Sequence, residues 1–169
     1  QGNIVTLYLD PVPRSRKIEI GYCDEDVIKM VCSVFQKFKT ENTLLIKCHP
    51  RTENKIVEKI LELFPREKII TSYNLKSMTD NEILNISDKV LGMTSIMLAH
   101  ALVLDKPTLS IQINPTETGK KRSNYLLNKV LSGTEEEIFS FLKSKVIRKN
   151  LIDTCIFTES CSKIYREME

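Results

Sequence analysis

Apolar positions along the chain follow two alternating spacings, one typical of buried strands and one typical of helices. Short apolar runs, rich in β-branched residues and bounded by polar or turn-forming residues, occur five times and predict strands. The five predicted strands cover residues 3–9, 43–48, 67–73, 88–92 and 107–113.

The segments between these strands carry apolar residues at helical spacing. Asp24 and Thr52 are residue types that favour N-caps, and each stands at the start of such a segment. Thr134 is followed by three glutamates, which is typical of a helix start because acidic residues favour the positive end of the helix dipole. The predicted helices cover residues 24–39, 52–64, 79–86 and 94–104, and the region from about residue 123 onward.

Strands that alternate with helices predict parallel strands joined by right-handed crossovers. The predicted fold is therefore α/β, a doubly wound, mainly parallel five-stranded sheet with helices on both faces, in a Rossmann-like arrangement. With 169 residues and 41% hydrophobic content, the chain can bury one full core, so a single domain over residues 1–169 is expected.

Composition removes several classes of partner. The net charge is only +3, and no basic block is interleaved with aromatic residues, so nucleic acid is not expected. No apolar run approaches the roughly 20 residues that span a bilayer, and no signal peptide is visible. The five cysteines are odd in number and lack Cys-x-x-Cys spacing, which indicates reduced thiols in a cytoplasmic protein without a zinc site. Neither a metal nor another cofactor is predicted.

In an open parallel sheet, ligands bind outside the carboxyl ends of the strands, near the point where the strand order reverses. His49 directly follows the second predicted strand and should point into that crevice. Pro50 limits the backbone of His49 to extended conformations. An imidazole held in this way can donate a hydrogen bond to a phosphate oxygen. A capping or packing role in a strand-to-helix turn is the alternative, and His49 alone does not separate the two.

Gly92, Thr94 and Ser95 stand between the fourth predicted strand and its helix. Gly92 allows a tight turn, and the start of the helix offers free N–H groups at the positive end of the dipole. Two hydroxyls placed there could bind a phosphate. An ordinary Ser or Thr N-cap would explain the same residues.

Other polar residues near the predicted crevice are weaker candidates. The Glu82 carboxylate, early in a short helix, could accept both ribose hydroxyls of a nucleotide, but glutamate is common in first turns because of the dipole. His100 lies inside the helix that follows Ser95 and is expected to be structural. Two loops carry basic clusters that could neutralise a phosphate or simply be solvated: Arg14, Arg16 and Lys17, and Lys120, Lys121 and Arg122.

Three segments taken together, KCHPR, NEIL and VLGMTSIMLAHALVLDKPTLSI, resemble the nucleotide-sugar half of GT-B glycosyltransferases, and more narrowly bacterial sialyltransferases. Those enzymes carry a His-Pro motif after one strand and a Ser-Ser or Ser-Thr motif after a later strand, and both motifs contact the donor phosphate. His49-Pro50 and Thr94-Ser95 match them in order and in strand context. Glu82 matches the glutamate that binds the cytidine ribose. The resemblance covers residues 4–113.

The resemblance implies half of a GT-B fold: the donor-binding domain of a glycosyltransferase that uses CMP-sialic acid or a related cytidine nucleotide sugar in bacterial surface glycan synthesis. A glycan acceptor would bind through an N-terminal domain that is missing here, so the isolated domain is expected to be inactive. Cytoplasmic localisation is implied, with peripheral contact at the inner face of the membrane as the only membrane association. The implied roles are catalysis for His49 and donor binding for Pro50, Glu82, Gly92, Thr94 and Ser95.

The sequence departs from that family pattern at several places. Ile96 stands where a second serine could follow Ser95, and His100 and Asp105 stand where many GT-B relatives have Glu and Gly. The general base of sialyltransferases comes from an acidic pair followed by glycine, and no such triplet occurs in these 169 residues. CDP-glycerol glycerophosphotransferases, which carry similar His-Pro and Ser-Ser elements, remain an alternative. So do a non-hydrolysing nucleotide-sugar epimerase and a non-enzymatic nucleotide-binding module.

Overall fold

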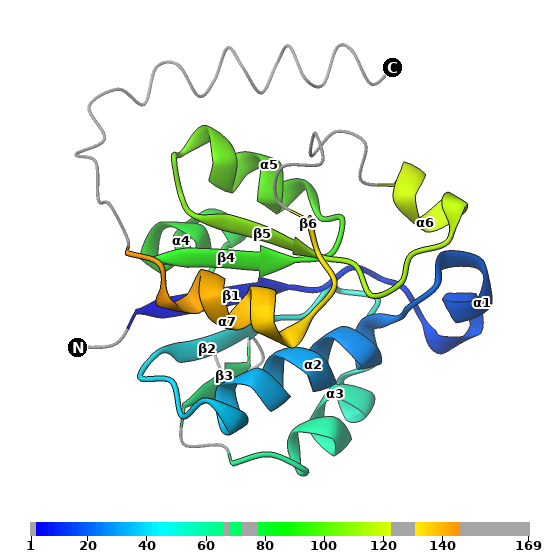
Figure 1. Cartoon of the computed structure of the whole chain (residues 1–169), viewed down its shortest axis with the longest axis horizontal. Helices are drawn as coiled ribbons and strands as arrows, with labels where there is room; N and C mark the ends of the chain where they lie inside the picture. The colour runs from blue at the N-terminus through cyan, green and yellow to red at the C-terminus, as the bar shows by residue number, and fades with distance from the viewer. Residues whose placement is uncertain (1–2, 66–67, 72–77, 123–130, 146–169) are drawn as a thin grey trace.

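A computed structural model describes residues 3–65, 68–71, 78–122 and 131–145 of the chain. Its centre is one sheet of six parallel strands in the order β3-β2-β1-β4-β5-β6 (Figure 1). The chain builds outward from β1 in one direction and then from β4 in the other, so the order reverses between these two strands. This topology confirms the predicted doubly wound parallel sheet. The strands are β1 (Ile4–Tyr8), β2 (Thr43–Lys47), β3 (Ile69–Thr71), β4 (Lys89–Gly92), β5 (Thr108–Ile111) and β6 (Leu131–Ser132).

The first five strands lie inside the five predicted ranges, whereas β6 corrects the prediction of helix from residue 123 onward. Leu131 and Ser132 pair with Ser110 and Ile111 of β5. Two residues are too few to show a strand periodicity in sequence, so the pairing with β5 alone defines this strand. The predictions for residues 67, 72–73, 123–130 and 146–169 lie outside the described residues.

Helices cover both faces of the sheet. On one face lie α2 and α3, together with α7, which packs beside α2; α4 and α5 pack on the other face (Figure 1). No helix in the described part of the chain is long and apolar enough to cross a membrane. The helices are α1 (Lys17–Ile20), α2 (Asp24–Lys37), α3 (Asn54–Leu61), α4 (Asp80–Ile86), α5 (Ile96–Val103), α6 (Glu117–Lys121) and α7 (Glu135–Lys143), and a 3-10 turn, η1 (Arg14–Arg16), precedes α1.

Residues of β1 alternate between the two cores, as a strand between two layers of helices requires. Val5 and Leu7 are fully buried in the core formed with α2, α3 and α7. Tyr8 belongs to the second core, which α4 and α5 cover. Thr6 faces the same side as Tyr8, and its hydroxyl shares a hydrogen bond of 2.5 Å with the Ser87 hydroxyl. The central strand therefore has both faces buried, which explains its continuous apolar run.

Two predicted N-caps are wrong by one residue. Cys23 caps α2, and Glu53 stands at the N-cap of α3. The predicted caps, Asp24 and Thr52, instead bond to each other, because the Thr52 hydroxyl donates to the Asp24 carboxylate at 3.4 Å. The other Asp24 oxygen accepts the Val12 N–H at 2.8 Å. These bonds join the loop after β1 to the turn after β2.

Lys89, the first residue of β4, is a fully buried lysine whose side chain binds the carboxyl end of α7. Its Nζ donates to the carbonyls of Phe141, Leu142 and Ser144 at 2.6–2.7 Å and also contacts the Ser144 hydroxyl at 3.2 Å. The last carbonyls of a helix lack intrahelical partners and carry the negative end of the dipole. Lys89 therefore satisfies these carbonyls and fixes α7 against the amino edge of the sheet.

Candidate functional site

His49, Asp10 and Thr94 form a row at the carboxyl edge of the three central strands. In the parallel register, Tyr8 of β1 stands between Lys47 of β2 and Gly92 of β4. Two residues further along each strand direction, Asp10 follows β1, His49 follows β2 and Thr94 follows β4. Asp10 therefore follows the middle strand of the three, between the strands that precede His49 and Thr94. The row spans the β1/β4 position where the strand order reverses, which is where an open α/β sheet binds ligands.

The middle residue of this row, Asp10, is bonded to Thr94. One Asp10 carboxylate oxygen accepts the Thr94 backbone N–H at 2.5 Å and also the Thr94 hydroxyl. Asp10 is 6% exposed, so a nearly buried carboxylate occupies the place beside the start of α5. Sequence reasoning did not single out Asp10. Its position directly after a buried strand is the signal that could have singled it out.

Ser95 acts as the N-cap of α5, and Gly92 is a strand residue. The Ser95 hydroxyl accepts the Met97 N–H at 3.4 Å. Gly92 ends β4 with no positive φ, which corrects the expectation of a glycine turn. A Cβ on Gly92 would lie 3.0 Å from the Leu98 side chain and from the Tyr8 carbonyl oxygen, so close packing of α5 on the sheet accounts for this glycine.

His49 is half-buried in the turn that leads from β2 to α3. Its Nδ1 accepts the Arg51 N–H at 3.1 Å, and its carbonyl accepts the Thr52 N–H at 2.8 Å. A neutral imidazole that accepts at Nδ1 carries its proton on Nε2. The turn therefore selects the tautomer that can donate from Nε2, while Pro50 stays exposed in the turn itself.

Glu82 lies in the first turn of α4, which also starts at the carboxyl edge. Asp80 fixes that start, because its carboxylate lies 3.0 Å from the Lys47 ammonium and its carbonyl accepts the Tyr8 hydroxyl at 3.3 Å. Glu82 itself completes a capping box: its carboxylate accepts the Thr79 N–H at 2.7 Å and the Thr79 hydroxyl at 2.9 Å. These hydrogen bonds lower the pKa of Glu82. In this structure the carboxylate serves the helix, and a ribose would have to compete with Thr79.

A buried tyrosine and an arginine lie near the row from the loop side. Tyr22 is 1% exposed, and its pKa is raised to about 12, first by burial and then by the Asp10 charge, while Arg122 opposes the rise. The buried Nη1 of Arg122 has no hydrogen-bond partner among the described residues. Sequence reasoning did not consider Tyr22 and left Arg122 undecided within a basic cluster. In the same cluster, Lys120 pairs with Glu117 at 2.7 Å.

The loops after β1 and β5 meet at this edge through α1 and α6, which lie together at one end of the molecule (Figure 1). The Thr116 N–H donates to the Ile20 carbonyl at 3.0 Å, and the Thr116 hydroxyl donates to the Glu19 carbonyl. A Cβ on Gly119 would lie 2.2 Å from the Ile20 carbonyl oxygen, and one on Gly21, which has φ +104°, would lie 2.4 Å from the Asn114 carbonyl oxygen. The two loops therefore approach closely only because both positions lack a side chain.

The described part of the chain shows neither a cluster of metal ligands nor an activated thiol. No group of three or more potential metal ligands occurs there. Cys23, Cys32 and Cys48 are buried. Burial raises the pKa of the Cys32 thiol to about 12, which keeps it protonated and unreactive. His100, in α5, has its pKa lowered by burial. The predicted independence from metals and cofactors stays a prediction.

No protein-family model matches the sequence, and no curated protein matches it either. Solved structures do share the fold. The S. aureus MnaA–UDP co-structure matches with a TM-score of 0.50 and 12% identity over 82% of this chain. A mutant O-GlcNAc transferase from Thermobaculum terrenum matches with a TM-score of 0.50 and 15% identity over 99% of this chain. The chain spans only 36% of each of these neighbours, so the likeness establishes a Rossmann-like fold similar to one part of larger proteins.

Proposed function

We propose that this chain is the donor-binding domain of a glycosyltransferase that uses a cytidine nucleotide sugar, CMP-sialic acid or a related sugar acid, in bacterial surface glycan synthesis. The observation that carries the proposal is the row of His49, Asp10 and Thr94 at the carboxyl edge of the central strands. The sequence resemblance named His49-Pro50 and Thr94-Ser95 as a donor phosphate site, and the topology brings both motifs to one edge. The fold likeness to a UDP-bound protein and to an O-GlcNAc transferase agrees with a nucleotide-sugar ligand.

The chemistry in this proposal is displacement at the anomeric carbon of the donor sugar. An acceptor hydroxyl forms the new C–O bond while the bond from the anomeric carbon to the phosphate oxygen breaks, and the phosphate leaves with both electrons. The Nε2–H of His49 is the donor that would stabilise the charge growing on that oxygen. A general base that takes the proton of the acceptor hydroxyl is not among the residues assigned here, and we expect it to come from the acceptor-binding domain.

The bond between Asp10 and Thr94 limits how a phosphate can lie in this site. Thr94 already donates its backbone N–H and its hydroxyl to the Asp10 carboxylate. A phosphate beside Asp10 would therefore meet a like charge. The first N–H groups of a helix have no intrahelical partner, so the start of α5 at Ile96 still offers a donor. We therefore expect the phosphate to lie between His49 and Ile96 rather than on Thr94, and the isolated domain to bind the nucleotide weakly.

A uridine nucleotide is the alternative ligand, because the MnaA neighbour holds UDP. A uridine ligand would fit an epimerase-like domain, and CDP would fit a glycerophosphotransferase-like domain. Isothermal titration calorimetry of the chain against CMP, CDP, UMP and UDP separates these functions. Tightest binding of CMP supports the proposal, preference for UDP supports the epimerase alternative, and tightest binding of CDP supports the glycerophosphotransferase alternative. Absence of binding supports a non-enzymatic module with another ligand.

A matched pair of variants shows whether any bound nucleotide occupies the proposed site. His49→Ala should weaken CMP binding, whereas His100→Ala, which changes the other histidine of the chain, should not. An equal loss in both variants would contradict the assignment of His49.

A further inference from the structure

A cavity of about 330 Å³ opens beside the candidate site, on the face of the sheet that α2 and α3 cover. It lies between the loop after β1 and the turn after β2, at the starts of these two helices. Its volume falls at the lower end of the range of small-molecule pockets, about 300–1,000 Å³. The lining residues that matter most for its chemistry are Val12, Arg14, Ile28, Arg51, Ile56 and Val57.

Most of the surface that lines this cavity is apolar. Val12, Ile28 and Val57 are at most 1% exposed and contribute surface from three different segments. Ile56 is 38% exposed, which makes it one of the few large apolar side chains of the described residues that water reaches. Polar partners would gain little on these walls, so the body of a ligand here should be apolar.

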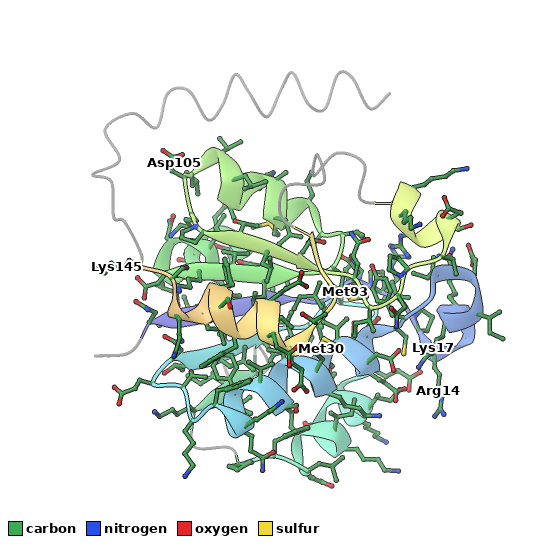
Figure 2. All side chains as sticks on the ribbon, in the orientation of Figure 1. Arg14, Lys17, Met30, Met93, Asp105 and Lys145 are labelled. Atoms are coloured by element: carbon green, nitrogen blue, oxygen red, sulfur yellow. The ribbon has the colours of Figure 1, made fainter. Side chains whose placement is uncertain are left out.

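Two arginines on the rim have no salt-bridge partner among the residues that the structure describes. Arg14 comes from the loop after β1, where Figure 2 shows it at the same end of the molecule as Lys17, and Arg51 comes from the turn after β2. No described carboxylate lies within salt-bridge distance of either side chain. The third arginine of the lining, Arg16, is already paired through two hydrogen bonds of 2.7 and 2.9 Å with Glu19.

Two of the three acidic residues of the lining are engaged elsewhere. The Asp24 carboxylate accepts the Val12 N–H and the Thr52 hydroxyl. Glu25 lies 3.7 Å from the Lys29 ammonium. Glu53 is exposed at the start of α3 and is the remaining negative charge. The unpaired charge around the cavity is therefore two guanidinium groups against one exposed carboxylate.

We propose that this cavity binds a small organic anion, an oxyanion head on an apolar body, with the head between Arg14 and Arg51 and the body against Val12, Ile56 and Val57. Guanidinium groups recognise carboxylate and phosphate oxygens through paired hydrogen bonds. The proposal does not rest on a nucleotide site at His49. It assigns a second site, joined to the first by the turn that contains both His49 and Arg51.

Methyl-detected NMR titration of the chain tests the proposal, with Ile28, Ile56 and Val57 reporting on the cavity. The probes are phenyl phosphate and benzoate, which differ in the head, and inorganic phosphate and phenyl glucoside, which lack the body and the charge respectively. Phenyl phosphate or benzoate should change the chemical shifts of the cavity methyl groups with a Kd of about 1 mM or lower. Comparing their two Kd values shows whether the site prefers a phosphate or a carboxylate head. The other two compounds should bind at least fivefold more weakly.

Variants separate recognition by the arginines from general attraction of anions. Arg14→Gln and Arg51→Gln should each weaken the better probe about fivefold or more. Lys55→Gln removes the same charge from an exposed α3 residue outside the cavity and should leave the Kd within twofold. Absence of cavity shifts, an equal loss in Lys55→Gln, or equal binding of inorganic phosphate would each overturn the proposal.

Discussion

The Asp10 carboxylate lies 2.5 Å from the Thr94 backbone nitrogen, so the two central strands β1 and β4 are bridged at the place where their order reverses. The negative charge of Asp10 therefore lies beside the start of α5, where the sequence predicted a phosphate to bind. The bridge organises the crevice, but it also opposes a second anion there.

Asp10→Asn should therefore strengthen CMP binding, by about fivefold or more, because the variant removes a like charge within a few ångströms of the phosphate. The same change should lower the free energy of unfolding by about 1–2 kcal/mol, because the Thr94 donors lose a charged acceptor. Calorimetry and urea unfolding measure the two effects.

Asp88→Asn is the matched control, since the Asp88 carboxylate also accepts a backbone N–H, that of Ile4 at 2.9 Å, but at the opposite edge of the sheet. It should cost stability without changing CMP binding. Weaker binding in Asp10→Asn would mean that the carboxylate contacts ligand hydroxyls instead.

The two nitrogens of His49 can be tested separately. His49→Gln places an N–H donor near the Nε2 position, whereas His49→Asn preserves only an acceptor near Nδ1 for the Arg51 N–H. If Nε2 binds the phosphate, Gln should retain most of the CMP affinity and Asn should lose about tenfold. If His49 only completes the turn, Asn should instead retain affinity and Tm while Gln lowers the Tm.

The stability of the chain should depend on pH through Asp24. Burial raises the pKa of Asp24 from 3.8 to about 7 in the folded state, against the hydrogen bonds from Val12 and Thr52. Between about pH 4 and 7 the folded state then binds more protons than the unfolded state, so the free energy of unfolding falls as the pH rises through this window. Asp24→Asn should remove that fall, which is of order 3 kcal/mol. Urea unfolding at pH 4.5 and 7.5 compares the two proteins.

Asp26→Asn should shift stability in the opposite sense. Burial alone would raise the pKa of Asp26, but the hydrogen bonds from Lys17 and Cys23 outweigh it and lower the pKa. The contribution of this carboxylate is present above its unfolded pKa and lost on acidification. The cost of Asp26→Asn should therefore be larger at pH 7.5 than at about pH 2.5, which lies below the unfolded pKa. The same sign for both variants would show that Asp24 does not carry the raised pKa.

Lys89→Met should lower the free energy of unfolding by about 2–4 kcal/mol, because three carbonyls at the end of α7 would lose a charged donor. Hydrogen exchange should show faster opening of α7 than of α2. Lys106 is a suitable control, since its ammonium also donates to helix-end carbonyls, those of Ser87 at 2.7 Å and Asn85 at 3.3 Å, but it is half-exposed. Lys106→Met should cost about 1 kcal/mol, and equal costs would contradict the importance of burial.

The sheet could be predicted because its signals are local. A run such as Ile4–Tyr8 shows its burial in its own composition. Capping boxes are equally local, and Thr79 and Thr134 each cap the helix predicted for them.

The interactions of the candidate site were harder to predict because they join residues far apart in sequence. The bond from Thr94 to Asp10 crosses 84 positions, and that from Thr52 to Asp24 crosses 28. The sequence pattern correctly placed Thr94 after a strand end. The residues next to Thr94 in the sequence give no sign that the Asp10 carboxylate binds it. In the same way, Glu82 shows a helix start in its sequence, and only the structure shows that its oxygens are occupied by Thr79.

Gly21 and Gly119 each lie close to the backbone of the facing loop, and this closeness limits how the sequence can evolve. Because neither position tolerates even a methyl group without displacing a carbonyl oxygen of the facing loop, the segments after β1 and β5 cannot diverge independently. An insertion in one would have to be matched by a rearrangement of the other. Variation in ligand preference should therefore accumulate elsewhere along this edge, in the turn that carries His49 and Arg51, which is free of that constraint.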